Sequence, residues 1–440
     1  MNLSSFFVWF YIVVLCLLSN ISVKGQNKIN SSPLETPIRF HVSIPTNRPD
    51  SKAAPLYEND WGVLILPKTY NPTGKPTPLV IGCHGGAGSV SSSGSQTESY
   101  DLYKYLVSLG YAVMDMAGMP ESYSKRLKID HYRCDGSFIA IRSYIKGYDW
   151  VTKNYNIDTT GCYITGGSNG GATATNIVCH TSIPVKCEAG MSPLLSLKEL
   201  AWNITSGAIS GGEFSSYQNR ANVIRLYGMK DIKTLDELVN AKYDDSKVGL
   251  WDPFMFINTL NKNNKYRCPV KFWNPVDDNI VKIEYVRKFV KILKDNGNDA
   301  ELIEMEGGGH SPEYYGSTID KFTYQNRDCD LKQPVYELAQ WFGNYSGINP
   351  DIRRVDSFNS KSNIRVKIFP NPFVNYIKIE NDSLDELFTI KIFNFSGDVV
   401  YQQNMIKGNL TLNLSELPEG CYFLQYNSLS NNKCVKIIKK

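Results

Sequence analysis

The stretch Tyr163-Ile-Thr-Gly-Gly-Ser-Asn-Gly-Gly-Ala172 decides how the rest of the chain is interpreted. It places Ser168 in the spacing Gly-x-Ser-x-Gly, after a short apolar run and before a run of small, helix-compatible residues. This pattern is typical of a strand–turn–helix that holds a serine at the tip of a tight, strained turn. Glycine on both sides removes side chains that would collide there. The pattern predicts an exposed nucleophile at a helix N-terminus, which favours developing negative charge.

Apolar runs alternate with helical periods over residues 26–345, which predicts a doubly wound α/β sheet. We expect strands at residues 38–44, 61–67, 78–84, 111–116, 163–166, 187–191, 269–273 and 300–306. We expect helices at residues 97–109, 136–155, 170–180, 280–293 and 335–345. The fold class is therefore α/β, followed by a small all-β sandwich.

Five segments make up the predicted domain organisation. Residues 1–25 read as a signal peptide, because residues 6–18 form an apolar core too short for a comfortable membrane span, and Val23 and Gly25 suit a cleavage site. Residues 26–345 form the catalytic domain, residues 346–364 a polar linker, and residues 365–440 the sandwich of short alternating strands.

Within the catalytic domain, residues 194–266 break the alternation of strands and helices. They are rich in aromatic side chains, and we interpret them as a cap over the carboxyl ends of the strands, where such sheets bind ligands. The alternative is that these aromatics pack the edge of the sheet. The aromatics concerned are Trp202, Phe214, Tyr217, Trp251, Phe254 and Phe256.

Composition excludes several classes of protein. A chain of 440 residues with 42% hydrophobic residues has ample length for more than one globular domain. The formal net charge of +4 is small and spread out, so no nucleic-acid partner is expected. No stretch after the signal peptide reaches the length of a spanning helix. The ten cysteines match no zinc motif, and in an exported protein they predict one or more disulfides.

A serine hydroxyl needs a base to take its proton, and the chain has five histidines. We choose His310, which follows the last predicted strand in a glycine-rich turn, over His41, His84, His131 and His180. The base needs an acid to orient it, and two neighbouring aspartates end the strand that begins at Pro269. Asp278 is preferred on spacing and Asp277 stays open as the competitor. The order serine, aspartate, histidine is that of α/β-hydrolases.

An oxyanion needs two backbone N–H donors. One is expected from Asn169, which follows the nucleophile, and the other from the loop His84-Gly-Gly86, where glycine lets a substrate approach the backbone. Gly86 is the first choice for this second donor and Gly85 the alternative. Together these residues predict a serine hydrolase that needs neither a metal ion nor an organic cofactor.

Residues 60–345 resemble the α/β-hydrolase superfamily. The run Gly166-Gly-Ser-Asn-Gly-Gly171 looks like the nucleophile turn of the prolyl oligopeptidase family, and Asp277-Asp-Asn279 is similar to its acid loop. The chain has no room for that family's β-propeller. The His84-Gly-Gly loop is also common in secreted esterases, including feruloyl and acetylxylan esterases. The resemblance implies a hydrolase fold with a catalytic triad.

Residues 366–440 resemble the type A C-terminal sorting domain of the type IX secretion system of Bacteroidetes. The matching motifs are Ile368-Phe-Pro-Asn-Pro372, Phe393-Asn-Phe-Ser-Gly397, Leu417-Pro-Glu-Gly-Cys-Tyr-Phe-Leu424 and the terminal Lys439-Lys440. The resemblance implies the secretion machinery as a partner and the cell surface or exterior of a Gram-negative bacterium as the location. The alternative is a carbohydrate-binding sandwich, although no aromatic platform is evident.

These features favour a secreted serine carboxylic ester hydrolase. Ser168 would attack, with His310 as base, Asp278 as its orienting acid, and the Asn169 and Gly86 amides as oxyanion donors. The substrate expected is a small-molecule or oligosaccharide ester, such as an acetyl or feruloyl ester of plant polysaccharide. A peptidase acting on short peptides is the second enzymatic hypothesis. A hydrolase fold that has lost activity and binds a surface is the non-enzymatic one.

Overall fold

A computed structural model describes the protein at residues 34–86, 88–130, 135–202, 213–229, 233–350, 366–381, 388–394, 398–428 and 432–440. The predicted signal peptide, most of the predicted linker and His131 lie outside these ranges. The chain divides into two compact units, residues 1–350 and 351–440, which are described separately below.

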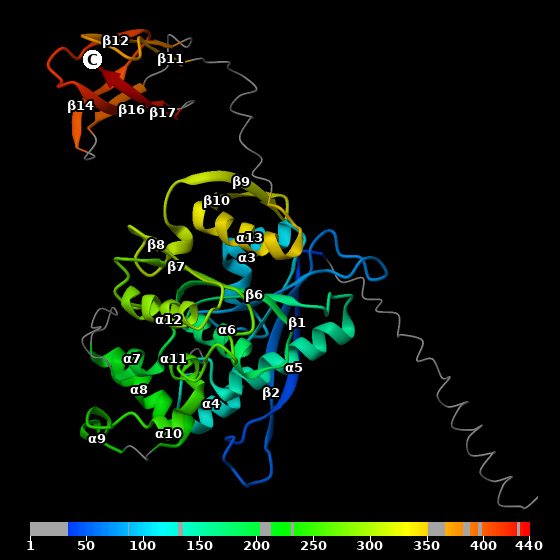
Figure 1. Ribbon diagram of the computed structural model, residues 1–440. Coiled ribbons are helices and arrows are strands. Elements are labelled where there is room, and N and C mark those ends of the chain that lie inside the picture. Colours follow the sequence, from blue (N-terminus) through cyan, green and yellow to red (C-terminus); the bar gives the residue numbers. More distant parts are fainter. Residues whose placement is uncertain are drawn as a thin grey trace, which may run out of the picture. The chain divides into compact units, whose positions relative to one another are not determined.

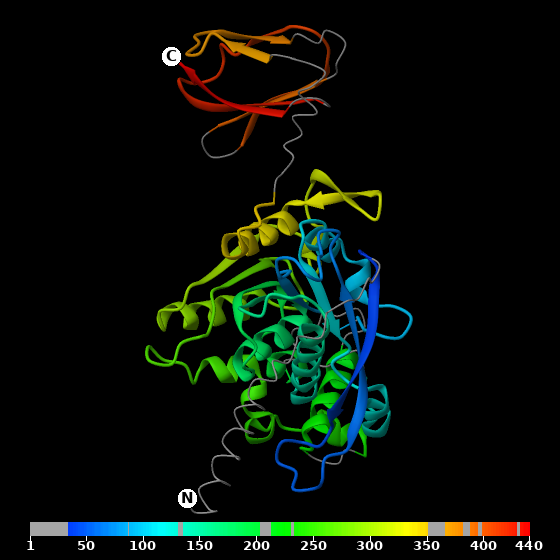
Figure 2. The same cartoon turned by 90° about the vertical axis from the view of Figure 1, so that its right-hand side faces the viewer.

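The first unit is built on an eight-stranded sheet in the order β1-β2-β4-β3-β5-β6-β7-β8. From β4 to β8 all neighbouring strands are parallel, whereas β2 runs antiparallel to both β1 and β4. The strands are β1 Pro37–Pro45, β2 Tyr57–Ile65, β3 Leu79–Cys83, β4 Ala112–Met116, β5 Cys162–Ser168, β6 Val185–Pro193, β7 Val270–Pro275 and β8 Ala300–Met305. The predicted α/β sheet is thus confirmed, with β1 and β2 as a long antiparallel edge (Figure 2).

Helices cover both faces of this sheet (Figure 1). One face packs against α5 Phe138–Asn154, α6 Asn169–His180 and α12 Ile283–Asp295. The other packs against α3 Asp101–Ser108 and α13 Gln333–Ser346. Local sequence sets the helix ends, since Ser137 caps α5 through the Ala140 amide and Gly347 closes α13 with a φ of 74°.

The single helix expected at residues 97–109 is instead two helices, α2 Gln96–Ser99 and α3. Ser95 and Glu98 form a reciprocal capping box at the start of α2, which fixes its first turn. Tyr100 then adopts an extended conformation, with φ −78° and ψ 128°, and interrupts the helix. The break gives Tyr100 a position on the wall of the cavity described below.

Residues 194–269 form short helices between β6 and β7. They are α7 Leu197–Trp202, α8 Glu213–Tyr227, α9 Leu235–Val239, α10 Asp245–Val248, the 3-10 turn η2 Gly249–Trp251 and α11 Pro253–Ile257. The side chains of Trp202, Trp251, Phe254 and Phe256 are partly buried against the core of the sheet. Those of Phe214 and Tyr217 lie outside what the structure describes. Within this segment Leu200 of α7 lines the catalytic cavity.

Two further elements of the first unit have no counterpart in the sequence-based expectation. A separate two-stranded hairpin, β9 Thr318–Tyr324 and β10 Arg327–Lys332, follows the predicted base and precedes α13. The short helix α4 Glu121–Leu127 follows β4. The hairpin buries Phe322, Tyr324 and Leu331 against the α3 and α13 side of the core.

In its described residues the second unit is built from antiparallel strands in two sheets, which confirms the predicted small all-β domain. One sheet holds β11 Val366–Phe369, β12 Tyr376–Asn381 and β15 Leu410–Asn413. The other holds β14 Val399–Ile406, β13 Phe388–Phe393, β16 Gly420–Ser428 and β17 Asn432–Lys439. Alternate residues such as Ile390, Ile392 and Leu424 enter one shared apolar core.

The predicted disulfides are not found in the part of the chain that the structure describes. Seven cysteines there carry thiols: Cys83, Cys162, Cys179, Cys187, Cys268, Cys329 and Cys421. Burial raises the pKa of the Cys162 thiol to about 12, so it behaves as a small apolar side chain.

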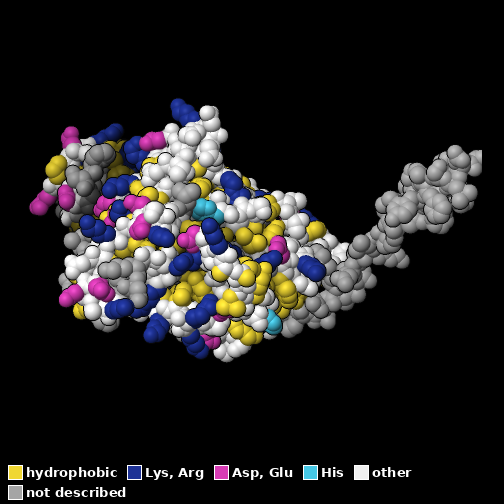
Figure 3. Space-filling model, turned by 90° about the horizontal axis from the view of Figure 1, so that it is seen from below, with side chains coloured by type: hydrophobic (Ala, Val, Ile, Leu, Met, Phe, Trp, Pro, Cys, Tyr) yellow, Lys and Arg dark blue, Asp and Glu magenta, His cyan; other side chains and the backbone are white. Residues whose placement is uncertain are grey.

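The described helices include none with the length and apolar character needed to cross a bilayer. On the face shown in Figure 3, basic and acidic side chains are interspersed rather than separated by sign. This distribution agrees with the small net charge of the sequence.

Candidate active site

Ser168 lies at the tip of the turn between β5 and α6, with a φ of 51° and a ψ of −126°. This conformation is rare for a residue with a side chain and is held by the packing around it. A Cβ atom on Gly166 would lie 2.2 Å from the carbonyl oxygen of Gly170, and one on Gly170 would lie 2.0 Å from the carbonyl oxygen of Cys83. Both flanking positions therefore require glycine, which is the physical content of the motif.

The structure brings Ser168, His310 and Asp278 together. The Nε2 atom of His310 lies 2.9 Å from the Oγ atom of Ser168, and its Nδ1 atom lies 3.0 Å and 3.2 Å from the two carboxylate oxygens of Asp278. Ser168 ends β5, and His310 and Asp278 lie in the loops after β8 and β7, so the three meet at the carboxyl edge of the parallel strands.

The two candidate acids have different places. Asp278 is buried and accepts hydrogen bonds of 2.9 Å from the amides of Ile280 and Val281, which fix its carboxylate toward His310. Asp277 is exposed and accepts a 3.0 Å hydrogen bond from the amide of Gly309. Asp278 thus occupies the orienting position, and Asp277 ties down the loop that carries the histidine.

Two of the three candidate oxyanion donors remain suited to that role. Gly86 and Asn169 both line the cavity beside Ser168, and a Cβ atom on Gly86 would lie 2.4 Å from the Asn169 side-chain nitrogen. Gly85 is different, because its amide already donates a 2.9 Å hydrogen bond to Oε1 of Gln96. The pair of Gly86 and Asn169 is therefore the better candidate.

A second histidine–aspartate pair lies under the glycine-rich loop. Nδ1 of His84 lies 3.2 Å and 3.3 Å from the carboxylate oxygens of Asp115, and both side chains are almost fully buried. Asp115 also accepts 2.5 Å hydrogen bonds from Thr97 and Tyr144. Burial lowers the pKa of His84, but the charge and hydrogen bond of Asp115 and the charge of Asp60 outweigh it and raise that pKa above its ordinary value.

This pair was not expected from the sequence, which placed His84 only at the start of the loop. Because His84 directly precedes Gly85 and Gly86, the pair anchors the loop that carries a candidate oxyanion donor. Asp115 lies in β4, which is adjacent to β3 in the sheet. His84 and Asp115 are 31 residues apart in the sequence, and no local pattern indicated that they would be in contact.

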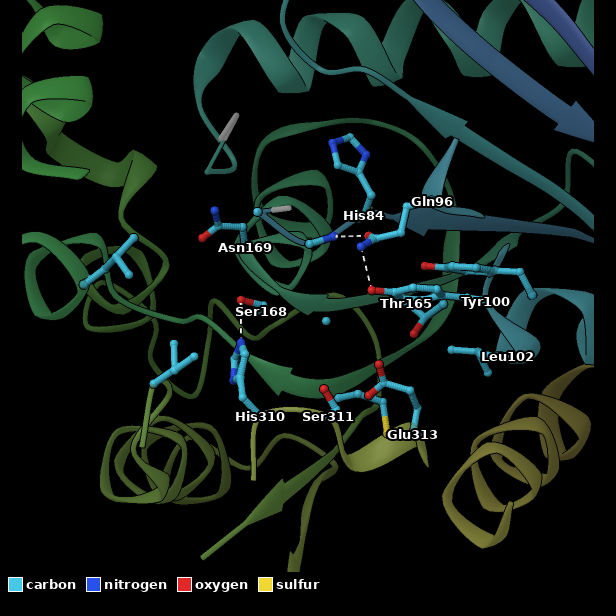
Figure 4. Close-up of a pocket in the computed structure, with 18 residues that line it drawn as sticks. His84, Gln96, Tyr100, Leu102, Thr165, Ser168, Asn169, His310, Ser311 and Glu313 are labelled. Carbon is cyan, nitrogen blue, oxygen red and sulfur yellow. Dashed lines mark hydrogen bonds between the residues drawn. The ribbon is translucent and has the colours of Figure 1, made fainter. Parts of the chain in front are cut away.

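The catalytic cavity has a volume of about 320 Å³ and opens beside Ser168 (Figure 4). Gln96, Tyr100 and Leu102 form one stretch of its wall, and Ser311 and Glu313 lie between Leu102 and His310. The Nε2 atom of Gln96 donates a 2.6 Å hydrogen bond to the Tyr100 hydroxyl. None of these five residues was expected at the site. Glu313 lies three residues after His310, and that proximity was the only available signal.

No group of three or more metal-ligating side chains lies close enough to hold a metal ion, within the described ranges.

Family comparisons match two parts of the chain. Residues 103–272 match the model of the prolyl oligopeptidase family, which spans the nucleophile turn. Residues 367–440 match the secretion system C-terminal sorting domain. A search of curated proteins found no match.

Several solved structures are similar to this chain at low sequence identity. An acylaminoacyl peptidase of Pyrococcus horikoshii is 17% identical, with a TM-score of 0.46, over 72% of this chain and 43% of that one. A thermophilic esterase of Thermogutta terrifontis, Est2 with bound butyrate, is 18% identical, with a TM-score of 0.42, over 66% of this chain and 91% of that one. A putative dipeptidyl aminopeptidase IV of Bacteroides ovatus is 13% identical, with a TM-score of 0.44, over 72% of this chain and 36% of that one. This chain spans less than half the length of the two peptidases.

The resemblances on which the sequence expectation rested are thus confirmed for both parts of the chain. The sorting domain indicates type IX secretion to the cell surface or the extracellular space. Ser168, with its histidine partner, lies inside the segment that matches the prolyl oligopeptidase family, and the segment that matches the sorting domain follows it in the chain.

Proposed function

We propose that the protein hydrolyses carboxylic esters outside the cell through an acyl-enzyme formed on Ser168. His310 takes the proton of the serine hydroxyl as it attacks the ester carbonyl. Asp278 orients the imidazole and stabilises its cation. The amides of Gly86 and Asn169 bind the oxyanion. His310 then gives its proton to the departing alcohol, and a water molecule releases the acid by the same route in reverse.

One observation carries this proposal. The Ser168 hydroxyl and the His310 imidazole are already 2.9 Å apart, inside a cavity, with Asp278 on the far side of the ring. A base within hydrogen-bond reach of a nucleophile and itself held by a third group is the arrangement that serine catalysis needs.

The size of the cavity supports a small acyl group. A volume of about 320 Å³ lies at the low end of ligand pockets, which hold roughly 300–1,000 Å³. We propose acetyl or feruloyl esters of plant polysaccharide as the substrate class for two reasons. Their acyl groups are small, and the sorting domain indicates that the protein is delivered outside the cell. Only the acyl end of such a polymer would need to enter.

A peptidase acting on short peptides is the second candidate. It is favoured by the match of residues 103–272 to the prolyl oligopeptidase family. The same three residues would cleave an amide, with His310 protonating an amine in place of an alcohol.

The test compares wild-type protein with Ser168→Ala on p-nitrophenyl acetate, methyl ferulate and Ala-Pro-p-nitroanilide. Ester turnover should fall by a factor of ~10⁵ or more in the variant, because the nucleophile is lost. Ser108→Ala, which alters a serine outside the cavity, is the matched control and should keep wild-type rates. Turnover of the anilide alone would favour the peptidase.

A fluorophosphonate probe separates the enzymatic proposals from the non-enzymatic one. Wild-type protein should be labelled and Ser168→Ala should not. Absence of labelling in both proteins would indicate a hydrolase fold that only binds a surface. Failure to release acetate or ferulate from xylan, despite labelling, would remove the polysaccharide part of the proposal.

A further inference from the structure

The cavity beside Ser168 contains a carboxylate that the proposed mechanism does not use. Glu313 lies in the short 3-10 helix η3 Pro312–Tyr314, three residues after the proposed base. Its side chain is half-buried and points into the cavity (Figure 4). In the described part of the chain, neither Lys, Arg nor His forms an ion pair with it.

The other charged groups that line the cavity do not balance the negative charge of Glu313. No Lys or Arg is among the lining residues. The two histidines of the lining are each hydrogen-bonded to an aspartate of their own, His84 to Asp115 and His310 to Asp278. Among the described lining residues Glu313 is therefore the one carboxylate, and no Lys or Arg of that lining balances its charge.

Aromatic rings surround the same part of the cavity. Tyr100 and Tyr103 line it, and the ring of Tyr100 meets the ring of Tyr314 edge-on at 6.0 Å. Tyr100 is itself held by the hydrogen bond from Gln96. A carboxylate beside tyrosine rings is the environment in which an ammonium group gains both an ion pair and cation–π attraction.

The electrostatic state of Glu313 agrees with this environment. Burial raises the pKa of its carboxyl group, and a hydrogen bond from its own backbone amide and the charge of a protonated His310 oppose that rise. Holding the ionised form in a partly dry cavity without an ion-pair partner among the described Lys and Arg residues is costly, and a bound cation would offset that cost.

We propose that Glu313 binds an ammonium group of the substrate next to the carbonyl that Ser168 attacks. The inference rests on the proposed hydrolysis at Ser168, and it replaces the acetyl and feruloyl esters named above with esters or amides that carry a positive charge near the scissile bond. Because Glu313 follows His310 by three residues, their Cα atoms are at most about 11 Å apart. An amino-acid ester, or a short peptide with a free N-terminus, carries an ammonium group within that reach, whereas a simple acetyl or feruloyl ester does not.

The first experiment measures selectivity with two matched pairs of substrates. L-alanine methyl ester and N-acetyl-L-alanine methyl ester differ by a charge on the acyl side. Acetylcholine and 3,3-dimethylbutyl acetate differ by a charge on the alcohol side. Wild-type protein should prefer the charged member of at least one pair in kcat/KM, and Glu313→Gln should reduce that ratio at least tenfold. The pair that responds identifies the side on which the cation lies.

A matched control comes from the same loop. Glu306→Gln removes one negative charge from an exposed residue that does not line the cavity, and it should leave both ratios unchanged. A ratio that falls equally in Glu306→Gln would assign the effect to general charge rather than to Glu313. A ratio that Glu313→Gln leaves unchanged would overturn the proposal, including the case in which it slows both substrates of a pair alike.

The second experiment measures binding without turnover. Ser168→Ala protein is titrated calorimetrically with L-alanine methyl ester, choline and their uncharged counterparts, and compared with Ser168→Ala/Glu313→Gln. The charged ligand should bind at least tenfold more tightly, and only when Glu313 is present. If Ser168→Ala shows this preference for the charged ligand but wild-type protein hydrolyses no ester, the result supports this inference and rejects the proposed function. Ester turnover with no preference for charge would do the reverse.

Discussion

Two histidines that line one cavity are each paired with an aspartate, and the two pairs differ in what surrounds them. In both, the Nδ1 atom of the imidazole faces a carboxylate at 3.0–3.3 Å. The side chain of His310 is 22% exposed and its Nε2 atom meets Ser168. The side chain of His84 is 1% exposed, and its buried Nε2 atom has no hydrogen-bond partner among the described residues.

The difference shows that the same two residue types serve different purposes according to access. An imidazole that is to move protons needs a nucleophile on one nitrogen and an exit to the substrate. An imidazole sealed beneath a loop can only hold that loop in place. A histidine–aspartate pair is therefore not evidence of catalysis unless the second ring nitrogen reaches the cavity.

The same substitution at both histidines gives the largest expected effect and tests directly whether the two pairs differ in function. His310→Ala should reduce kcat on p-nitrophenyl acetate by a factor of ~10⁶, because the base is lost, and should barely change the melting temperature. His84→Ala protein that remains folded should keep far more activity, since its imidazole takes no part in proton transfer. Equal losses of kcat in the two folded variants would show that the pairs are not functionally distinct.

Substitutions at the two adjacent aspartates test which of them orients His310. Asp278→Asn should lower kcat by ~10⁴, because the amide no longer holds the imidazole in the productive tautomer. Asp277→Asn, which alters only the residue that accepts from the Gly309 amide, should cost less than about tenfold by loosening one loop hydrogen bond. Steady-state kinetics on the same ester measures both. The reverse order would make Asp277 the orienting acid.

A stability measurement examines the sealed pair. His84→Ala should lower the free energy of unfolding by about 3–5 kcal/mol, because it leaves Asp115 buried without its histidine. The pKa of His84 is raised in the folded state, so its contribution is fully present below the unfolded pKa and is lost as the pH rises through the folded value. Denaturant titrations should therefore show a larger difference between wild type and variant at pH 5.5 than at pH 9. A difference independent of pH would indicate lost packing alone.

A third buried acid extends the comparison to a carboxyl group without a histidine. Glu188 of β6 is buried and accepts hydrogen bonds from Thr175 and Tyr266, and burial raises its pKa to about 7. The folded state therefore holds a proton that the unfolded state releases, and stability falls as the pH rises from 4.5 to 7.

Glu188→Gln should remove about 3 kcal/mol of that fall, since each unit of pKa shift corresponds to about 1.4 kcal/mol. The measurement is the free energy of unfolding at pH 5 and pH 8 in both proteins. Parallel changes in the two proteins would show that Glu188 is ionised in the folded state at both pH values.

Much of the fold could be predicted because each buried strand is a short apolar run. The elements that escaped have no such signature. In the strands of the hairpin β9–β10, six of the thirteen residues are charged and only Phe322, Tyr324 and Leu331 are buried, so neither strand is an apolar run. The antiparallel placement of β2 between β1 and β4 depends on strand order, which no local pattern encodes.

The residues of the candidate site also fall into those that a local sequence pattern marks and those that only the fold brings to the site. Ser168, Asp278 and His310 could be named because each lies in a turn just after a predicted strand, with glycine or acidic neighbours that mark it. Asp115 could not, since its contact with His84 depends on β3 and β4 being neighbours. Glu313 could not either, because only the path of the loop after His310 turns its side chain into the cavity.

The cavity wall at residues 96–103 comes from a different stretch of chain than the turns that carry the serine, the acid and the base. The proton-transfer machinery and the surface that selects the substrate can therefore change independently over evolutionary time. A library of variants restricted to this wall and to position 313 would explore new substrates while preserving the reaction. The break at Tyr100 splits one expected helix into two and places the Tyr100 side chain on the cavity wall, where a substitution would contact the substrate directly.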